Sequence, residues 1–115
     1  MSFQEEALTQ MSVAKYIKEN YPNALFTISI AGAKLSVGQW KKLKKMGYSV
    51  GTPDIFIFEP RKDYHGLILE LKRLKGGVLS DDQKNWLCNL NTRKYLAECC
   101  HGFEEAKERI DLYLK

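Results

Sequence analysis

One stretch of this chain, residues 51–72, limits the possible folds more than any other. It contains Gly-Thr-Pro-Asp, then Ile-Phe-Ile-Phe, a polar connection with Pro and Asp, and Gly-Leu-Ile-Leu-Glu-Leu-Lys. β-Branched, aromatic and other apolar residues on both sides of a polar turn are typical of a β-hairpin. Successive side chains of a strand point to opposite faces of a sheet. The second strand would therefore carry Leu67, Leu69 and Leu71 on one face and Ile68, Glu70 and Lys72 on the other.

Three charged side chains interrupt this apolar hairpin. Asp54 stands where the first strand begins, and Glu70 and Lys72 stand near the end of the second. Charged groups are rarely placed in a hydrophobic sheet unless they are paired or bind a ligand. Carboxylates suit Mg²⁺ or Mn²⁺, which can polarise a phosphate oxygen and lower the pKa of a bound water. An ion pair of Lys72 with one of the carboxylates is the alternative interpretation.

Composition favours one soluble globular domain over residues 1–115. The hydrophobic fraction is 44% and the charged fraction is 28%, and such a chain is long enough for a single core. No apolar run approaches the roughly 20 residues that span a bilayer. The first residues are polar and acidic rather than a signal peptide, so we expect a cytoplasmic protein without membrane contact. Three cysteines without CxxC spacing indicate neither a disulfide framework nor a zinc site.

The net charge of +4 is modest, but the basic residues are clustered. Such clusters suit a polyanionic partner. The alternative is that these side chains are simply solvated on a helix face or loop. The candidate DNA contacts are Lys41, Lys42, Lys44, Lys45, Arg73 and Lys75.

Periodicity and capping residues predict the remaining elements. Together with the hairpin they give the order helix, strand, helix, strand, strand, helix, strand, helix, which is typical of a mixed α/β sheet flanked by helices. Beyond the hairpin, the predicted segments are a helix from Ser2 to about Asn20, a strand at Leu25–Ile30, a helix at Ser36–Met46, a helix opened by Ser80, a strand at Tyr95–Cys100 and a last helix after Gly102.

The two N-terminal helices carry specific expectations about their inner faces. In the first helix, Leu8 and Met11 belong to the apolar stripe. In the helix at Ser36–Met46, the predicted inward residues are Val37, Trp40 and Leu43. We interpret Trp40 as a core anchor, with a base-stacking residue as the alternative.

Two capping-box spacings leave the roles of some polar residues open. Ser2 and Glu5 have this spacing, which gives Glu5 a structural duty and leaves Glu6 either a surface carboxylate or a site residue. Ser80 and Gln83 have it too, so Gln83 is a helix cap, an active-site residue or both.

These motifs together resemble a known family. Pro53-Asp54 followed by Glu70-Leu71-Lys72 resembles the PD-(D/E)xK nuclease superfamily. The wider pattern looks like a stand-alone VRR-NUC domain, a type of nuclease common in phages and prophages. It consists of Met46-Gly47-Tyr48, Gly51-Thr52-Pro53-Asp54, Tyr64-His65-Gly66-Leu67, Glu70-Leu71-Lys72 and Ser80-x-x-Gln83-x-x-Trp86.

The resemblance implies a restriction-endonuclease-like core and assigns roles within it. Lys72 would be the catalytic lysine, and Gln83 would be the glutamine that the family places beside the active site. Glu5 competes with Glu6 for the position on the first helix. The implied metal ligands are Asp54, Glu70, the backbone carbonyl of Leu71, and Glu6.

The resemblance also implies an activity. We expect an endodeoxyribonuclease that depends on Mg²⁺ or Mn²⁺ and is selective for branched DNA, like a Holliday-junction resolvase. We also expect a homodimer with two-fold symmetry, in the cytoplasm of a bacterium or a phage-infected host cell. The second hypothesis is a non-catalytic or partner-dependent DNA-binding protein in replication or repair.

Overall fold

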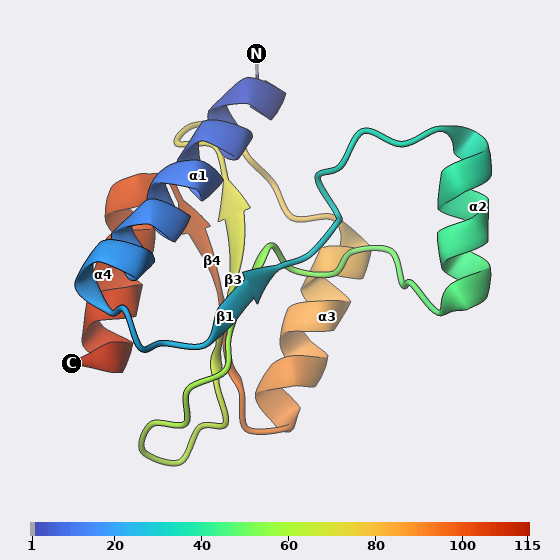
Figure 1. Ribbon diagram of the computed structural model, residues 1–115. Coiled ribbons are helices and arrows are strands. Elements are labelled where there is room, and N and C mark those ends of the chain that lie inside the picture. The colour runs from blue at the N-terminus through green and yellow to red at the C-terminus, as the bar shows by residue number, and fades with distance from the viewer. Residues whose placement is uncertain (1) are drawn as a thin grey trace.

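The fold is described from a computed structural model and covers residues 2–115, with side chains from residue 5 onward. These residues form four helices and four strands in the order predicted from the sequence, and Figure 1 shows their arrangement. The helices are α1 (Ser2–Asn20), α2 (Val37–Met46), α3 (Asp81–Thr92) and α4 (Phe103–Leu114). The strands are β1 (Phe26–Ile28), β2 (Ile55–Ile57), β3 (Leu67–Lys72) and β4 (Leu96–His101).

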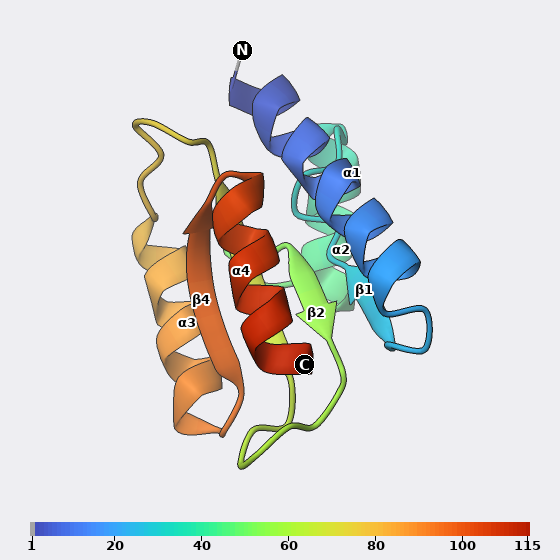
Figure 2. The same ribbon diagram turned by 90° about the vertical axis from the view of Figure 1, so that its left-hand side faces the viewer.

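The four strands form one mixed sheet in the order β1-β2-β3-β4. The predicted hairpin is the antiparallel pair β2–β3, in which Ile55 lies opposite Leu69. β1 pairs antiparallel with β2, whereas β4 runs parallel to β3 on the other side. Helices α1 and α4 cover one face of the sheet and α3 covers the other (Figures 1 and 2). This arrangement confirms the predicted mixed α/β fold.

The main core lies between the sheet and helices α1 and α4. Alternation in β3 is as predicted, because its three inward leucines belong to this core while Ile68 packs on the opposite face against Leu87 of α3. Complete burial of an aliphatic side chain stabilises a fold by roughly 1.5–3 kcal/mol. The buried residues of the main core are Val13, Ile17, Ile55, Ile57, Leu67, Leu69, Leu71, Cys100, Ala106, Ile110, Tyr113 and Leu114.

The strand predicted at Leu25–Ile30 is shorter in the structure, where β1 covers Phe26–Ile28. Its partner β2 is also only three residues long, so the regular ladder is short. Single hydrogen bonds extend the pairing at both ends, from Phe58 N to Leu25 O (2.8 Å) and from Ser29 N to Asp54 O (3.0 Å). The second of these bonds fixes the end of β1 beside Asp54.

Helix α1 buries Val13 and Ile17, but the predicted inward positions Leu8 and Met11 are 62% and 66% exposed. The prediction for these two residues is therefore wrong. At 100° per residue, Leu8 and Met11 lie on the side of α1 opposite Val13 and Ile17, which face the core. The side chain of Ser2, the predicted cap, lies outside the described residues. No helix in residues 2–115 has the length and apolar character needed to cross a membrane.

Hydrogen bonds fix α1 against α4. The phenols of Tyr16 and Tyr21 both donate to one carboxylate oxygen of Asp111, each at 2.6 Å. Burial opposes ionisation of Asp111, but the two phenolic donors outweigh it and lower the pKa of this carboxyl below its usual range. Helix α1, which begins beside the end of β3, is thereby tied to the body of the domain.

Helix α2 is formed by local signals rather than by packing. Ser36 and Gln39 make a reciprocal capping box at its start, and Gly47 ends it with a φ of 115°. None of its residues is buried, and Val37 is 73% exposed. The predicted inward face of Val37, Trp40 and Leu43 is therefore wrong, and Trp40 is not a core anchor. Trp40 is half-buried against Tyr48, at a ring distance of 5.4 Å, and does not enter the core.

Candidate active site

The hairpin brings Asp54 to the end of β3. Pro53 precedes it and has no N–H with which to continue the ladder between β2 and β3. The Asp54 backbone N–H donates to Leu69 O at 3.0 Å, and its side-chain Oδ2 accepts from the Leu71 N–H at 2.7 Å. The carboxylate thus takes the place of a backbone carbonyl as the acceptor for a donor on β3. This fixes the Asp54 side chain beside the residues on either side of Leu71.

Glu70 is the buried charged residue of the sheet, with a side chain only 3% exposed. Its Oε2 accepts a hydrogen bond from Nε2 of Gln83 on α3 at 3.3 Å. Its Oε1 is buried and has no hydrogen-bond partner among the described residues. A buried polar atom without a partner costs free energy of folding and calls for a functional explanation. A cation is the simplest group that could satisfy this oxygen.

Burial disfavours ionisation of both carboxyls, and the charge of Asp54 further disfavours ionisation of Glu70. Burial raises the pKa of Asp54, and the hydrogen bond from the Leu71 N–H together with the charge of Lys72 offsets only part of this effect. Burial, helped by the negative charge of Asp54, raises the pKa of Glu70 to about 9. A bound cation would relieve both effects, because it compensates negative charge in a site that water does not fully solvate.

Lys72 follows Glu70 on the same face of β3 and is half-buried. Its positive charge lowers the pKa of both carboxyls. Within the described part of the chain, however, Lys72 makes no ion pair with a carboxylate within 4.0 Å. The ion-pair interpretation of this cluster is therefore not supported by the geometry. The ammonium group is left available for a further anion.

The structure gives Glu5 and Glu6 different surroundings. Glu5 Oε2 accepts from the Leu74 N–H at 2.8 Å, just beyond the end of β3. Glu6 is half-buried, and its negative charge makes the smallest of the contributions that raise the pKa of Glu70. Among the described side chains, no three His, Cys, Asp or Glu residues gather as a ready-made metal cluster. Of the other predicted carboxylate ligands, Asp54 acts most strongly on Glu70, because its charge is the largest contribution after burial to the raised pKa of Glu70.

Gln83 has both of the contacts considered from its spacing. Its Oε1 accepts from the Ser80 N–H at 2.9 Å and completes the capping box at the start of α3. Its Nε2 faces Glu70. The helix cap therefore fixes the amide group in the orientation that donates to the carboxylate.

Two residues beside the site were missed by sequence reasoning. The parallel pairing of β3 with β4 sets Cys99 next to Glu70 and His101 next to Lys72. Burial, together with the negative charge of Glu70, raises the pKa of the Cys99 thiol. No sequence signal identifies these neighbours, because α3 separates the two strands and the register between them is not a local property.

The predicted DNA contacts fall into two groups. The four lysines at 41–45 are all exposed on α2, which stands apart from the sheet in Figure 1. Arg73 and Lys75 lie in the loop that directly follows β3, where Arg73 donates to Gly76 O at 3.2 Å. Only the second group adjoins the carboxylates along the chain.

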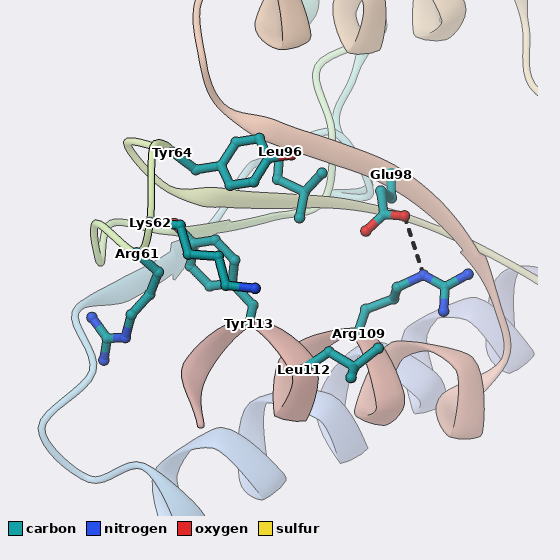
Figure 3. A pocket seen from close by; sticks show the side chains of 8 residues that line it. All are labelled: Arg61, Lys62, Tyr64, Leu96, Glu98, Arg109, Leu112 and Tyr113. Atoms are coloured by element: carbon teal, nitrogen blue, oxygen red, sulfur yellow. Dashed lines mark hydrogen bonds and ion pairs between the residues drawn. The ribbon is translucent and has the colours of Figure 1, made fainter.

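A groove of about 450 Å³ lies elsewhere, between the β2–β3 connection, β4 and α4 (Figure 3). Arg109 crosses it to pair with Glu98 at 3.2 Å. The groove contains none of the predicted site residues, and we assign it no function. The lining residues are Arg61, Lys62, Tyr64, Leu96, Glu98, Arg109, Leu112 and Tyr113.

The fold, with two carboxylates and a lysine at the end of its central hairpin, defines a nuclease-type α/β domain. The family model of the VRR-NUC domain matches residues 4–104. The chain therefore belongs to the VRR-NUC family, a family of nucleases, and the resemblance noted from the sequence is confirmed.

Comparison with solved structures agrees with this assignment. A structure described as a VRR_NUC domain protein superimposes with a TM-score of 0.82 and 24% sequence identity, covering 96% of this chain and 88% of that one. At this identity the similarity establishes the fold alone. No curated protein matches the chain.

Proposed function

We propose that this chain is a divalent-metal-dependent endodeoxyribonuclease that hydrolyses phosphodiester bonds at the Asp54–Glu70 pair. The observation that carries the proposal is the buried Glu70 oxygen, which lacks a partner next to a second buried carboxylate. Such an arrangement is costly in a protein that binds nothing there. Membership of a nuclease family supports the same conclusion.

The residues present fit a hard divalent cation such as Mg²⁺ or Mn²⁺. Both side chains offer oxygen ligands, and burial, which raises the pKa of both, disfavours their charged forms unless a cation is bound. The proposed ligands are Asp54, Glu70, the backbone carbonyl of Leu71, and Glu6. When bound, the cation would polarise a phosphate oxygen and lower the pKa of an attacking water.

The protein side chains have distinct proposed tasks. Lys72 would hold its ammonium group against the phosphate and neutralise the charge that develops there during hydrolysis. Gln83 would keep Glu70 in one orientation through the hydrogen bond that it already makes. Arg73 and Lys75, together with the lysines at 41–45, would contact the DNA backbone.

The finer parts of the proposal follow from family resemblance. We propose selectivity for branched DNA, as in Holliday-junction resolvases, and a homodimer that presents two sites to two strands. Two-fold symmetry is the common solution for an oligomer of identical chains. The proposed location is the cytoplasm of a bacterium or of a phage-infected cell.

A cleavage assay tests the catalytic part. Fluorescent four-way junction, flap and plain duplex substrates are incubated with Mg²⁺, Mn²⁺ or EDTA. We expect metal-dependent cutting of branched DNA that falls by at least about 100-fold in Glu70→Gln. Glu98→Gln is the matched control, because it makes the same chemical change on β4 at a carboxylate paired with Arg109. It should retain cleavage within about twofold.

Two outcomes would contradict the proposal. Cleavage that persists in EDTA, or that is unchanged in a folded Glu70→Gln variant, would remove the assigned site. Binding of all substrates without cleavage of any would favour the non-catalytic or partner-dependent DNA-binding protein instead.

A further inference from the structure

Positive charge is concentrated in one segment, residues 30–52, which we call the lysine arm. It contains five lysines and no acidic residue: Lys34, Lys41, Lys42, Lys44 and Lys45. The whole chain has 18 basic and 14 acidic residues. The rest of the chain, residues 1–29 and 53–115, which we call the body, therefore has 13 basic residues against 14 acidic ones. The net positive charge of the protein belongs to the arm, and the body that holds the carboxylate site is close to neutral.

The arm is a separate structural unit that leaves and rejoins the body beside Asp54. At the start of the arm, the chain is held by the hydrogen bond that the Ser29 N–H donates to Asp54 O. Within the arm, the hydroxyl of Thr52 donates to the Tyr48 hydroxyl at 3.2 Å, and the return of the chain is fixed at Gly51. Gly51 has a φ of 90° and approaches Asp82 so closely that a Cβ would lie 2.7 Å from it. Both ends of the arm are thus anchored at the candidate site.

Helix α2 separates its basic and aromatic residues by face. At 100° per residue, the four lysines of α2 span an arc of about 160°, and Trp40 and Leu43 lie outside this arc, with Trp40 next to Lys44. Trp40 turns toward Tyr48 and is half-buried there. The lysine side is exposed and has no acidic neighbour on the helix. Like charges one turn apart destabilise a helix, so the sequence retains this face at a cost in stability.

We infer that the lysine arm binds the phosphate backbone of a double-stranded DNA segment that flanks the bond to be cut. A helix of this length spans about 15 Å, and duplex DNA carries one negative charge per roughly 1.7 Å of its axis. Several lysines on one face can therefore contact phosphates at the same time. This inference rests on the proposed action on DNA and names the form of DNA that the arm recognises.

The aromatic residues argue against an unpaired strand as the partner. Single-strand binding uses exposed rings on which successive bases stack. In the arm, Trp40 and Tyr48 face each other instead, and each is only half-exposed. The arm therefore offers charge without a stacking surface, which suits a duplex backbone and gives no means of reading base sequence.

The test measures DNA affinity independently of cleavage. Fluorescence anisotropy is recorded in EDTA for Glu70→Gln protein on a duplex and on a single strand of the same sequence, over a range of salt concentrations. The arm variant replaces Lys41, Lys42, Lys44 and Lys45 with Gln. The matched control replaces the exposed lysines Lys15, Lys18, Lys62 and Lys115 with Gln, which removes the same charge from the body.

We expect the arm variant to bind duplex at least about 10-fold more weakly, with a salt slope smaller by about 2–4. The control should keep nearly the wild-type slope. Loss of single-strand binding should be smaller than loss of duplex binding. The thermal midpoint should not fall in either variant, because the replaced side chains are exposed, and in the arm variant the loss of like-charge repulsion on α2 acts to raise it.

Equal behaviour of the arm variant and the control would overturn the inference, as would a larger loss on single strands. Wild-type binding to phosphatidylserine vesicles that requires the arm, with duplex binding that does not, would assign the arm to a membrane surface instead. The inference and the proposed function fail separately. Arm-dependent duplex binding without any cleavage would refute only the nuclease activity, and cleavage without arm dependence would refute only the role of the arm.

Discussion

At the scale of single residues, Glu70 carries most of the argument. It lies on β3 with both neighbouring strands paired, and only one of its two carboxylate oxygens has a partner among the described residues. Asp54 lies close enough to add its own charge. A structural role alone would be served better by an amide or an apolar side chain of similar size. The free-energy cost of burying Glu70 is explained if a cation completes the site.

This environment predicts an unusual pH dependence for the metal-free protein. The pKa of Glu70 rises from an ordinary value of 4.5 to about 9 on folding, so the folded state keeps a proton that the unfolded state has lost. The contribution of Glu70 to the free energy of unfolding is therefore greatest below about pH 4.5, and it falls as the pH rises toward 9. With these two pKa values the expected loss between pH 5 and pH 8 is roughly 3–4 kcal/mol.

Urea denaturation in EDTA measures this effect. Glu70→Gln cannot ionise, so the fall in the free energy of unfolding with rising pH should be much smaller in this variant than in the wild type. Glu98→Gln serves again as the control and should follow the wild type. Parallel pH profiles for wild type and Glu70→Gln would show that Glu70 is ionised in the metal-free fold, contrary to our account.

At the scale of elements, the start of α3 joins folding to the site. Ser80 accepts from the Gln83 N–H at 3.2 Å, and the Gln83 side chain accepts in return from Ser80. The free donor of the same amide then reaches Glu70. A single helix cap therefore stabilises α3 and orients a carboxylate on a neighbouring strand.

Two substitutions separate these tasks. Ser80→Ala should remove about 1 kcal/mol of stability through the lost cap and leave Mn²⁺ affinity within about threefold. Gln83→Ala should remove the cap bond and the Glu70 contact together, and so weaken Mn²⁺ binding about 10-fold. Urea denaturation and calorimetry give the two quantities. Equal metal affinities in the two variants would mean that the Gln83–Glu70 contact has no part in the site.

The elements also show which features a sequence can predict. Alternation placed the leucines of β3 and Glu70 on opposite faces correctly, and the turn signals placed α2 between Ser36 and Gly47. Periodicity indicates which face of a helix is apolar but not whether another element covers it. For that reason Val37 was wrongly expected to face inward. The neighbours of Glu70 on β4 depend on pairing between distant strands and have no local signature.

At the scale of the whole molecule, charge and chemistry are divided between two parts. The body holds the core, the paired carboxylates and Lys72, and it has almost no net charge. The lysine arm is basic, is joined to the body beside Asp54, and buries none of the α2 side chains. This division suits a nuclease that binds backbone phosphates in one place and hydrolyses a phosphodiester in another. For the same reason, the candidate site is located in the sequence by its carboxylates and not by the cluster of basic residues.

The measurement that tests the central claim most directly is a calorimetric titration of Mn²⁺ into protein freed of metal. The account predicts binding to the wild type and to Glu98→Gln, with affinity reduced at least about 10-fold in folded Asp54→Asn and Glu70→Gln variants. Binding should also release protons, because the cation replaces the proton held on Glu70. Absence of binding to the wild type, or equal affinity in all four proteins, would contradict the assignment of this pair as a metal site.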